Sequence, residues 1–534
     1  MILLTTVRRT RRRPRRPASL GGAARPRSLP DSPVTEAPVT ARQLLDLLVD
    51  PGSLHSWDEP VGTGYADPAY RDALARARER TGLDEAVLTG RALLDGRPIA
   101  LVAGEFGFLG GSIGVATAER ITRAVERATA ERLPLLALPV SGGTRMQEGS
   151  AAFLCMVRVT AAVHAHRAAG LPYLTYLRNP TMGGVFASWG TLGHLVLAEP
   201  GARLGFLGPR VYEELRGEPL PPAVQRAETL AAHGRLDAIV PPERLRVFLS
   251  RALTVLTAPS PTSHPAPSPS PVSLPAAPAA PPDAWESVLL SRRPDRLSAL
   301  ELLHHTADLF LPLDGDSALV RGLALIGGRP VMVVAQQRQG PDQPELPVTA
   351  ADLRAVRRQA RIAEELGLPL LTVVDTTGAE LSIEAELDGV ALEIAHCLTT
   401  LVGLRTPVLA VLLGQGSGGG ALALLPADRV LAAQHAWLAP LPPEGASAIV
   451  HRDGDHAPQL ARAQGITATD LTTTGLVDQV IPETPYPTDL RDRLATAITT
   501  ALTELAALPT PARLSARATR NRHLGGPTPA DTPR

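Results

Sequence analysis

Lysine is missing from this sequence of 534 residues, so all 53 basic residues are arginine. Its absence excludes catalysis through a lysine Schiff base and a phosphate-binding loop of the P-loop type, because both need a lysine amine. There are only two cysteines, Cys155 and Cys397. Two thiols cannot build a disulfide framework or a zinc ribbon, so we expect a reducing compartment and no zinc or other metal. No apolar run approaches the roughly 20 residues that span a bilayer, so we expect a cytoplasmic protein that makes no membrane contact.

Aromatic content and net charge are also low. Aromatic residues make up 3% of the chain and apolar residues 44%, so the core must be built mainly from leucine, valine and alanine. The 53 basic residues balance 53 acidic residues, and a chain without net charge has no overall field that would attract nucleic acid. The strongest charge run is a set of seven arginines between Arg8 and Arg16, which we interpret as part of a disordered basic tail.

Proline divides the chain into two halves. Ten of the 25 residues of Ala258–Pro282 are proline, and such a segment forms an extended linker without a packed core. On either side, short apolar runs alternate with helical patterns, which predicts parallel strands joined by crossover helices. We therefore expect an α/β protein in which one domain type is used twice. The expected segments are a disordered basic tail at 1–40, a domain at 41–256, a linker at 257–284, a second domain at 285–510 and a disordered tail at 511–534.

Two adjacent glycines, Gly183 and Gly184, follow an apolar run in "YLRNPTMGGVFASWGTLG". Glycine costs roughly 0.5–1 kcal/mol against alanine inside a helix, so a pair at a helix start needs a reason. One interpretation is a tight turn; the other is a pair of backbone N–H groups that can approach a negative oxygen. The second half has "GQGSGGGALALL" (Gly414–Leu425) after its corresponding apolar run. This recurrence favours two backbone anion sites, one in each half.

The motifs of both halves resemble those of one known family, the carboxyltransferase component of bacterial acetyl-CoA carboxylase. The first half resembles its β subunit and the second half its α subunit, over 57–248 and 285–483. The resemblance implies a crotonase-like (ClpP/crotonase) ββα superhelix in each half. The motifs that carry it include "FGFLGGSIG" (106–114), "LPVSGGTRMQEG" (138–149), "PTMGGVFAS" (180–188), "AEPGARLGFLGPRV" (198–211), "GLPLLTVVDTTGA" (367–379), "GQGSGGGALALLPADRVL" (414–431) and "PPEGASAIV" (442–450).

The resemblance implies transfer of a carboxyl group from carboxybiotin, held on a separate biotinylated carrier protein, to acetyl-CoA or another short acyl-CoA. It also implies a biotin carboxylase as partner and at least a homodimer, because in this fold one β-like and one α-like domain enclose each active site. The reaction develops negative charge on the enolate oxygen of the thioester and on the ureido oxygen of biotin, and each oxygen needs backbone donors. The residues expected to stabilise them are Gly183, Gly184, Gly419, Gly420 and Ala421. Those expected to line the substrate sites are Gly110, Gly111, Gly142, Gly143, Arg145, Gly208, Gly378 and Gly416.

Several other residues keep more than one interpretation. Arg145 and Glu148, in "GGTRMQEG", either form a structural ion pair or shape the acyl pocket. Arg292 and Arg293 are candidates for binding the phosphates of CoA, because no lysine can do so. The histidines are interpreted as structural or surface residues, since no motif needs a protein base: His194, His304 and His305.

The sequence departs from the family in three places. The four-cysteine zinc ribbon of the β subunit is missing, the second half reads "DTTGAELSIEAELDG" without the expected prolines, and the loop "QQRQGPDQPELPVTAAD" is short and contains no lysine. Two other functions stay open, one because related domains serve it and one because the second half departs from the family. One is a biotin-independent decarboxylase of malonyl thioesters, and the other is a non-catalytic partner of another carboxyltransferase chain.

Overall fold

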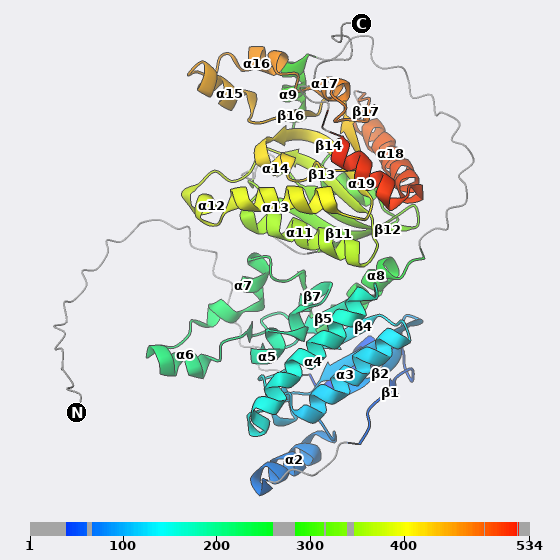
Figure 1. Ribbon diagram of the computed structural model, residues 1–534, viewed down its shortest axis with the longest axis vertical. Coiled ribbons are helices and arrows are strands. Elements are labelled where there is room, and N and C mark those ends of the chain that lie inside the picture. The colour runs from blue at the N-terminus through cyan, green and yellow to red at the C-terminus, as the bar shows by residue number, and fades with distance from the viewer. Residues whose placement is uncertain are drawn as a thin grey trace, which may run out of the picture. The chain divides into compact units, whose positions relative to one another are not determined.

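The computed structural model describes residues 39–60, 67–259, 283–313, 317–338, 346–484, 486–520 and 522. We refer to residues 39–259 as the first half and to residues 283–522 as the second half. Each half contains a sheet covered by helices, and the residues from Val39 onward form one compact unit (Figure 1). Most of the predicted basic tail, of the predicted linker and of the predicted C-terminal tail lies outside the described residues.

The first half is built on a seven-stranded sheet with the strand order β1-β2-β3-β4-β5-β7-β9. Strand β2 pairs antiparallel with β1 and β3, and the pairs from β3 to β9 are parallel. Parallel strands are covered on both faces, which explains why their sequences are nearly continuous apolar runs. The strands are β1 (His55–Ser56), β2 (Val87–Leu94), β3 (Arg97–Gly104), β4 (Leu135–Leu138), β5 (Tyr173–Leu177), β7 (Leu195–Ala198) and β9 (Ala238–Ile239), with β6 (Thr181–Met182) and β8 (Leu204–Gly205) forming a separate pair.

Helices α3 and α4 lie side by side over this sheet (Figure 1). Helix α3 buries an apolar stripe of Ala118, Ile121 and Val125, spaced as the helical period requires. The helices of the first half are α1 (Ala41–Leu48), α2 (Pro68–Thr81), α3 (Val115–Ala130), α4 (Gly149–Ala168), α5 (Gly183–Phe186), α6 (Pro209–Arg216), α7 (Ala227–Ala232) and α8 (Pro242–Leu256).

The second half repeats this order of strands. Its path β10-β11-β12-β13-β14-β15-β17 has the same directions as β1-β2-β3-β4-β5-β7-β9, and the one additional strand, β16, pairs with β14. Its strands are β10 (Leu309–Leu313), β11 (Leu319–Ile326), β12 (Arg329–Gln336), β13 (Leu370–Thr376), β14 (Val408–Ser417), β15 (Arg429–Ala433), β16 (Trp437–Ala439) and β17 (Gln479–Ile481). Its helices are α9 (Ala284–Ser291), α10 (Ala299–Thr306), α11 (Ala350–Glu365), α12 (Ile383–Leu387), α13 (Val390–Gly403), α14 (Gly418–Leu422), α15 (Pro443–Val450), α16 (Ala457–Ala463), α17 (Ala468–Thr473), α18 (Pro487–Ala507) and α19 (Thr510–Thr519).

The two halves share one apolar core. Helix α8 of the first half contacts β10, β11 and β12, and its Leu249 and Leu253 belong to the core that also contains Val333. Polar bonds add to this contact: Arg358 on α11 binds the buried carboxylate of Asp237 at 2.6 Å. The halves are therefore held together by burial and charge, independently of the segment that links them in sequence.

The expectation of disorder from residue 511 onward is wrong for 511–519, which belong to helix α19. The reason is a charge interaction with a distant residue, which the local composition does not indicate. Arg517 makes a bidentate pair with Asp428 at 3.0 and 2.6 Å and also donates to the carbonyl oxygens of Leu401 and Leu404 at the end of α13. Because Arg517 and Asp428 are both buried, this pair anchors α19 to the second half.

Candidate active site

Gly183 and Gly184 begin helix α5 directly after strand β6. Gly183 has φ +61°, a left-handed conformation that favours glycine, and both residues are partly exposed. The first N–H groups of a helix have no acceptor within the helix. These two backbone donors are therefore available to a group outside the chain.

A second glycine loop faces Gly184. A Cβ atom placed on Gly143 would lie 4.0 Å from the nitrogen of Gly184 and 3.7 Å from the Cα of Gly183. The loop is fixed on its other side, because the N–H of Gly142 donates to the carbonyl of Gly110 at 2.8 Å and a Cβ on Gly111 would lie 2.2 Å from the carbonyl oxygen of Val140. The predicted residues Gly110, Gly111, Gly142, Gly143, Gly183 and Gly184 therefore come together in space.

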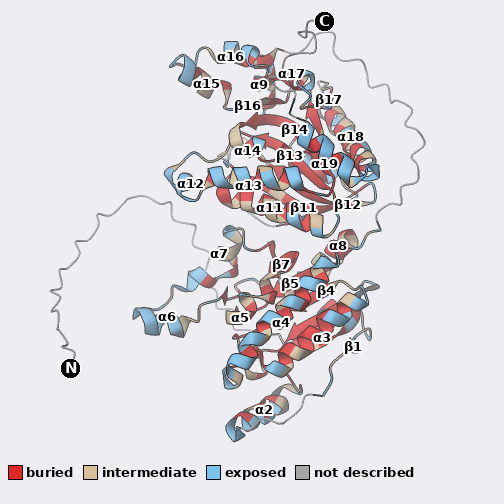
Figure 2. Cartoon of the chain, viewed as in Figure 1, coloured by how far each residue is buried: buried red, intermediate tan, exposed pale blue. Residues whose placement is uncertain are grey.

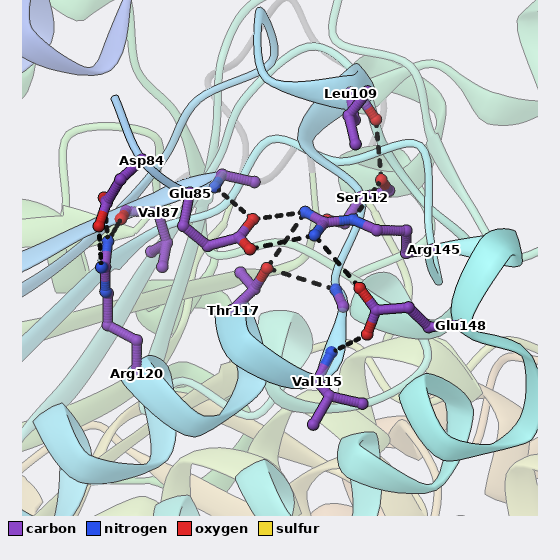
Figure 3. A network of polar contacts seen from close by, with 12 residues as sticks. Asp84, Glu85, Val87, Leu109, Ser112, Val115, Thr117, Arg120, Arg145 and Glu148 are labelled. Carbon is purple, nitrogen blue, oxygen red and sulfur yellow. Dashed lines mark hydrogen bonds and ion pairs between the residues drawn. The ribbon is translucent and has the colours of Figure 1, made fainter. Parts of the chain in front are cut away.

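Two residues after Gly143 the chain enters a buried polar network centred on Arg145 (Figure 3). The guanidinium is 0% exposed and pairs with Glu85 at 2.5 and 3.1 Å. It also donates to the carbonyl of Ser112 at 2.8 Å, and the backbone N–H of Arg145 donates to Ile113 at 3.0 Å. Burial disfavours the cation, but the hydrogen bond and charge of Glu85 outweigh it, so the pKa of Arg145 is raised and the cation is retained.

Glu148 completes this network. Its carboxylate accepts the N–H of Val115, in the first turn of α3, at 2.6 Å and contacts Arg145 at 3.5 Å. It also accepts a hydrogen bond from the hydroxyl of Tyr70. Because no part of Arg145 reaches the surface, the geometry favours the structural ion pair over direct contact of Arg145 with a substrate.

The second half builds the same arrangement from different residues. Ser141 Oγ accepts the N–H of Gly143 at 3.0 Å, and Thr376 Oγ1 accepts the N–H of Gly378 at 3.1 Å. The carbonyl of Gly143 accepts from Ile113, and the carbonyl of Gly378 accepts from Val348 at 3.1 Å. Gly378 and Gly143 thus occupy equivalent places after β13 and β4.

This equivalence extends to the short helices α5 and α14. It shows that the donors predicted in the second half were placed one residue too far along the chain. Gly418 has φ +62°, like Gly183, and Gly419 faces Ile394 on α13 as Gly184 faces Met156 on α4. Gly418 and Gly419 are partly exposed, whereas Gly420 and Ala421 are buried. The donors equivalent to Gly183 and Gly184 are therefore Gly418 and Gly419. Sequence reasoning missed Gly418, because three successive glycines do not show which one takes the positive φ.

The remaining predicted residues have other surroundings. Gly416 is buried in β14, where a Cβ would lie 2.6 Å from the carbonyl oxygen of Trp437, so it makes room for strand β16. Gly208 is the N-cap of α6. Arg292 is paired with Glu444 at 2.5 Å and Arg293 with Asp295 at 2.5 Å, so neither presents a free cation.

The histidines have no contact with the glycine clusters in the described residues. His194 is buried and its Nε2 lies 3.2 Å from the carboxylate of Glu365, while its Nδ1 accepts the N–H of Tyr173 at 3.0 Å. His304 and His305 are exposed.

The described residues include neither a membrane-spanning helix nor a metal-binding cluster. Within the described part of the chain, no helix combines the length and the apolar content that crossing a membrane requires. The described side chains also include no group of three His, Cys, Asp or Glu residues placed to bind a metal ion.

Solved structures share the fold. The structure of transcarboxylase 12S with hydrolysed methylmalonyl-coenzyme A bound matches with a TM-score of 0.69 and 22% identity, over 88% of this chain and 90% of that chain. A single-chain, multi-domain long-chain acyl-CoA carboxylase matches with a TM-score of 0.64 and 18% identity, over 86% of this chain and 45% of that chain. The predicted fold class, two crotonase-like α/β domains in tandem, is confirmed.

Sequence comparisons identify the family. A protein of Mycobacterium bovis named "Probable biotin-dependent acyl-coenzyme A carboxylase beta3 subunit" is 54% identical over 502 residues, covering 92% of this chain and 99% of that protein. The "Acetyl-coenzyme A carboxylase carboxyl transferase subunits beta/alpha" of Salinispora arenicola are 42% identical over 508 residues, covering 90% and 89%. The carboxyl transferase domain matches residues 35–512. The chain therefore belongs to the carboxyl transferase domain family.

Proposed function

We propose that this chain is the carboxyltransferase subunit of a biotin-dependent acyl-CoA carboxylase. It transfers a carboxyl group from carboxybiotin, held on a biotinylated carrier protein, to a short acyl-CoA, with acetyl-CoA giving malonyl-CoA. The observation that carries this proposal is the pair of equivalent glycine sites, Gly183–Gly184 facing Gly143 and Gly418–Gly419 beside Gly378. A reaction that develops charge on two different oxygens needs two such sets of backbone donors.

The chemistry assigns one oxygen to each half. Carboxybiotin loses CO₂ by cleavage of its N–C bond, and the electron pair leaves negative charge on the ureido group. This anion takes the α-proton of the acyl-CoA, whose enolate then attacks the CO₂ to form the new C–C bond. Because biotin itself accepts the proton, no protein base is required, which fits the absence of histidine or carboxylate side chains from the described glycine clusters. The resemblance of the first half to the β subunit favours the thioester oxygen for that half, which leaves the ureido oxygen to the second half.

A second copy of the chain completes each site. Large apolar side chains near both glycine clusters are exposed, and helix α6 is largely exposed along its length (Figure 2). Such side chains bury apolar area when a partner covers them, and enclosing the site also excludes water from the CO₂ intermediate. A dimer in which the first half of one copy covers the second half of the other meets both needs. The exposed residues are Met146, Phe153 and Leu154 in the first half, and Leu381, Ile383 and Leu387 in the second half.

The names of the relatives support the same partners. A subunit called beta3 of a biotin-dependent carboxylase implies other subunits, and we assign to them the biotin carboxylase and the biotin carrier. The transcarboxylase 12S structure is described as a hexamer assembly, which supports a homo-oligomer here. Zinc is not part of this proposal.

Incubation with malonyl-CoA, with and without free biotin, tests the proposal. We expect malonyl-CoA to be consumed only when biotin is present, because the carboxyl group needs an acceptor. Equal consumption without biotin would instead identify a biotin-independent decarboxylase. No consumption of malonyl-CoA, or of its methyl and longer-chain homologues, would favour a non-catalytic partner of another carboxyltransferase chain.

A further inference from the structure

Each short glycine helix has one carbonyl that is held by a polar side chain. In the second half, Gln336 is the last residue of β12 and is 1% exposed, and its Nε2 donates to the carbonyl oxygen of Gly420 at 2.8 Å. In the first half, the hydroxyl of Ser188 donates to the carbonyl oxygen of Gly184 at 2.5 Å. The two bonds reach the helices from different directions but act on the same kind of group.

These bonds matter because the helices are too short to hold themselves. Helix α5 has four residues and α14 has five, whereas about four N–H groups and four carbonyls at the ends of any helix lack partners within it. The carbonyls of Gly184 and Gly420 do not receive the regular helical bond, because the N–H groups of Ser188 and Leu424 donate to the carbonyls of Val185 and Ala421 instead, at 3.3 and 3.1 Å. The carbonyl of Gly184 shares its peptide unit with the N–H of Val185, and that of Gly420 with the N–H of Ala421. A hydrogen bond to either carbonyl therefore holds the peptide unit that follows the donor glycines, and it orients the short helix that carries their N–H groups.

The sheet itself does not require a glutamine at position 336. Gly104 occupies the equivalent position in β3, since Gly104 and Gln336 each lie opposite the first residue of the preceding strand. The Oε1 atom of Gln336 is buried and has no hydrogen-bond partner among the described residues. A buried acceptor without a partner is unfavourable, and an apolar side chain of similar size would avoid it. We therefore attribute the amide at this position to the bond made by Nε2, which offsets the cost of the unpaired Oε1.

We propose that Gln336 and Ser188 are positioning residues, Gln336 for the biotin-side glycine site and Ser188 for the thioester-side glycine site. This inference rests on the proposed function. Neither side chain has to touch a substrate: each orients backbone donors that must point at a negative oxygen in the transition state. Interactions realised mainly in the transition state change kcat more than KM.

The experiment uses the full chain in the reverse direction, from malonyl-CoA to free biotin. Gln336→Met removes the donor while keeping the volume, and Ser188→Ala removes the hydroxyl. We expect kcat to fall roughly three- to tenfold in each, the scale of one neutral hydrogen bond, with an unchanged KM for malonyl-CoA. The matched controls are Gln337→Met, whose amide bonds Leu300 and Arg338, and Thr399→Ala, whose hydroxyl bonds Ala395 within α13. Both controls should keep the kcat of the wild type.

The pH dependence of kcat in Gln336→Glu distinguishes a positioning role from a merely structural one. Burial raises the pKa of a carboxyl group at this position. The charged side chains that line the same small cavity, Arg338 and Asp375, already pair with each other at 3.2 Å. Below that pKa the protonated carboxyl donates to Gly420 as the amide did; above it, a carboxylate faces a carbonyl. We therefore expect the kcat of Gln336→Glu, relative to the wild type, to rise as the pH is lowered from 8.5 to 6, while the ratio for Gln336→Met stays flat.

The outcomes separate this inference from the proposed function. If the wild type transfers carboxyl groups and folded Gln336→Met and Ser188→Ala variants match it, the positioning role is wrong. The same holds if Gln336→Glu follows the pH dependence of Gln336→Met. If the wild type itself transfers nothing to biotin, the proposed function fails instead. Should Gln336→Met fail to fold, Ser188→Ala and the pH profile of Gln336→Glu still decide the question.

Discussion

Replacing Arg145 by methionine tests the buried polar network that is centred on this residue. The substitution keeps an apolar stem but leaves the carboxylate of Glu85, 1% exposed, without its cation. Removing one partner of a buried ion pair costs about 3–5 kcal/mol, because the remaining charge stays uncompensated. A domain of 150–250 residues loses about 2–4 °C of Tm for each kcal/mol, and the larger unit formed by the two halves loses less, so we expect a fall of roughly 5 °C in a thermal melt.

Two further variants give this prediction its controls. Arg145→Met combined with Glu85→Gln removes both charges, and we expect it to recover more than half of the lost stability. Arg123 on α3 also pairs with two carboxylates, Glu59 at 2.6 Å and Glu119 at 2.7 Å, but its side chain is 59% exposed. Exposed pairs contribute at most about 1 kcal/mol, so Arg123→Met should melt close to the wild type. Equal effects of Arg145→Met and Arg123→Met, or no recovery in the double variant, would refute the reasoning.

Three more predictions concern stability. Burial lowers the pKa of His166 from 6.5 to about 4. As the pH drops from about 6.5 to 4, the unfolded chain takes up a proton before the folded chain does, so the free energy of unfolding should fall. A His166→Gln variant that loses stability over this range as steeply as the wild type would contradict this. Arg517→Met leaves Asp428, 3% exposed, without its bidentate partner but with Arg513 still 3.6 Å away. We therefore expect a loss of about 3 kcal/mol in urea unfolding, the low end for a broken buried pair, against a negligible change for the exposed Arg293→Met. Glu365→Gln weakens the bonds to Arg167 and His194 that join the halves. Because Glu365 is 37% exposed, the free energy of unfolding should fall by no more than about 1 kcal/mol. A much larger fall would contradict the inference from exposure.

The sequence was informative wherever structure follows a local pattern. Apolar runs separated by helical stretches predicted two similar α/β halves; most of the proline-rich segment between them lies outside the described residues. The glycines at 183, 184 and 419 indicated where partly exposed backbone would lie, because glycine at a helix start is locally unfavourable, whereas Gly420 and Ala421 are buried. Each of these signals is read within a window of a few residues.

What the sequence did not predict depends on pairs of residues far apart in the chain. Arg145 finds Glu85, which lies 60 positions earlier, so its burial could not be read from "GGTRMQEG". Helix α19 forms because Arg517 meets Asp428, 89 positions away, although its composition is that of a polar tail. Gly418 was missed because a run of three glycines does not show which of them takes the positive φ, which in the structure is Gly418 at +62°.

The pair of substitutions Gly184→Ala and Gly184→Pro tests the central claim most directly. Both are small, and proline is tolerated in the first turn of a helix, but only proline deletes the backbone N–H. Gly419→Ala and Gly419→Pro form the equivalent pair in the second half. The measurement is carboxyl transfer between malonyl-CoA and biotin for variants whose melting matches the wild type.

Each proline variant should lose about 100-fold or more in kcat relative to its alanine counterpart, the scale of one lost oxyanion donor. Alanine requires a small shift of a neighbour in each case, because a Cβ on Gly184 would lie 3.1 Å from Thr144 Oγ1 and one on Gly419 would lie 2.5 Å from Cδ1 at the far end of Ile394. The alanine variant carries this steric cost without losing the N–H, so it is the reference for each proline variant. A folded Gly184→Pro or Gly419→Pro variant that turns over as fast as its alanine counterpart would contradict the account, because the glycines would then serve only to turn the chain.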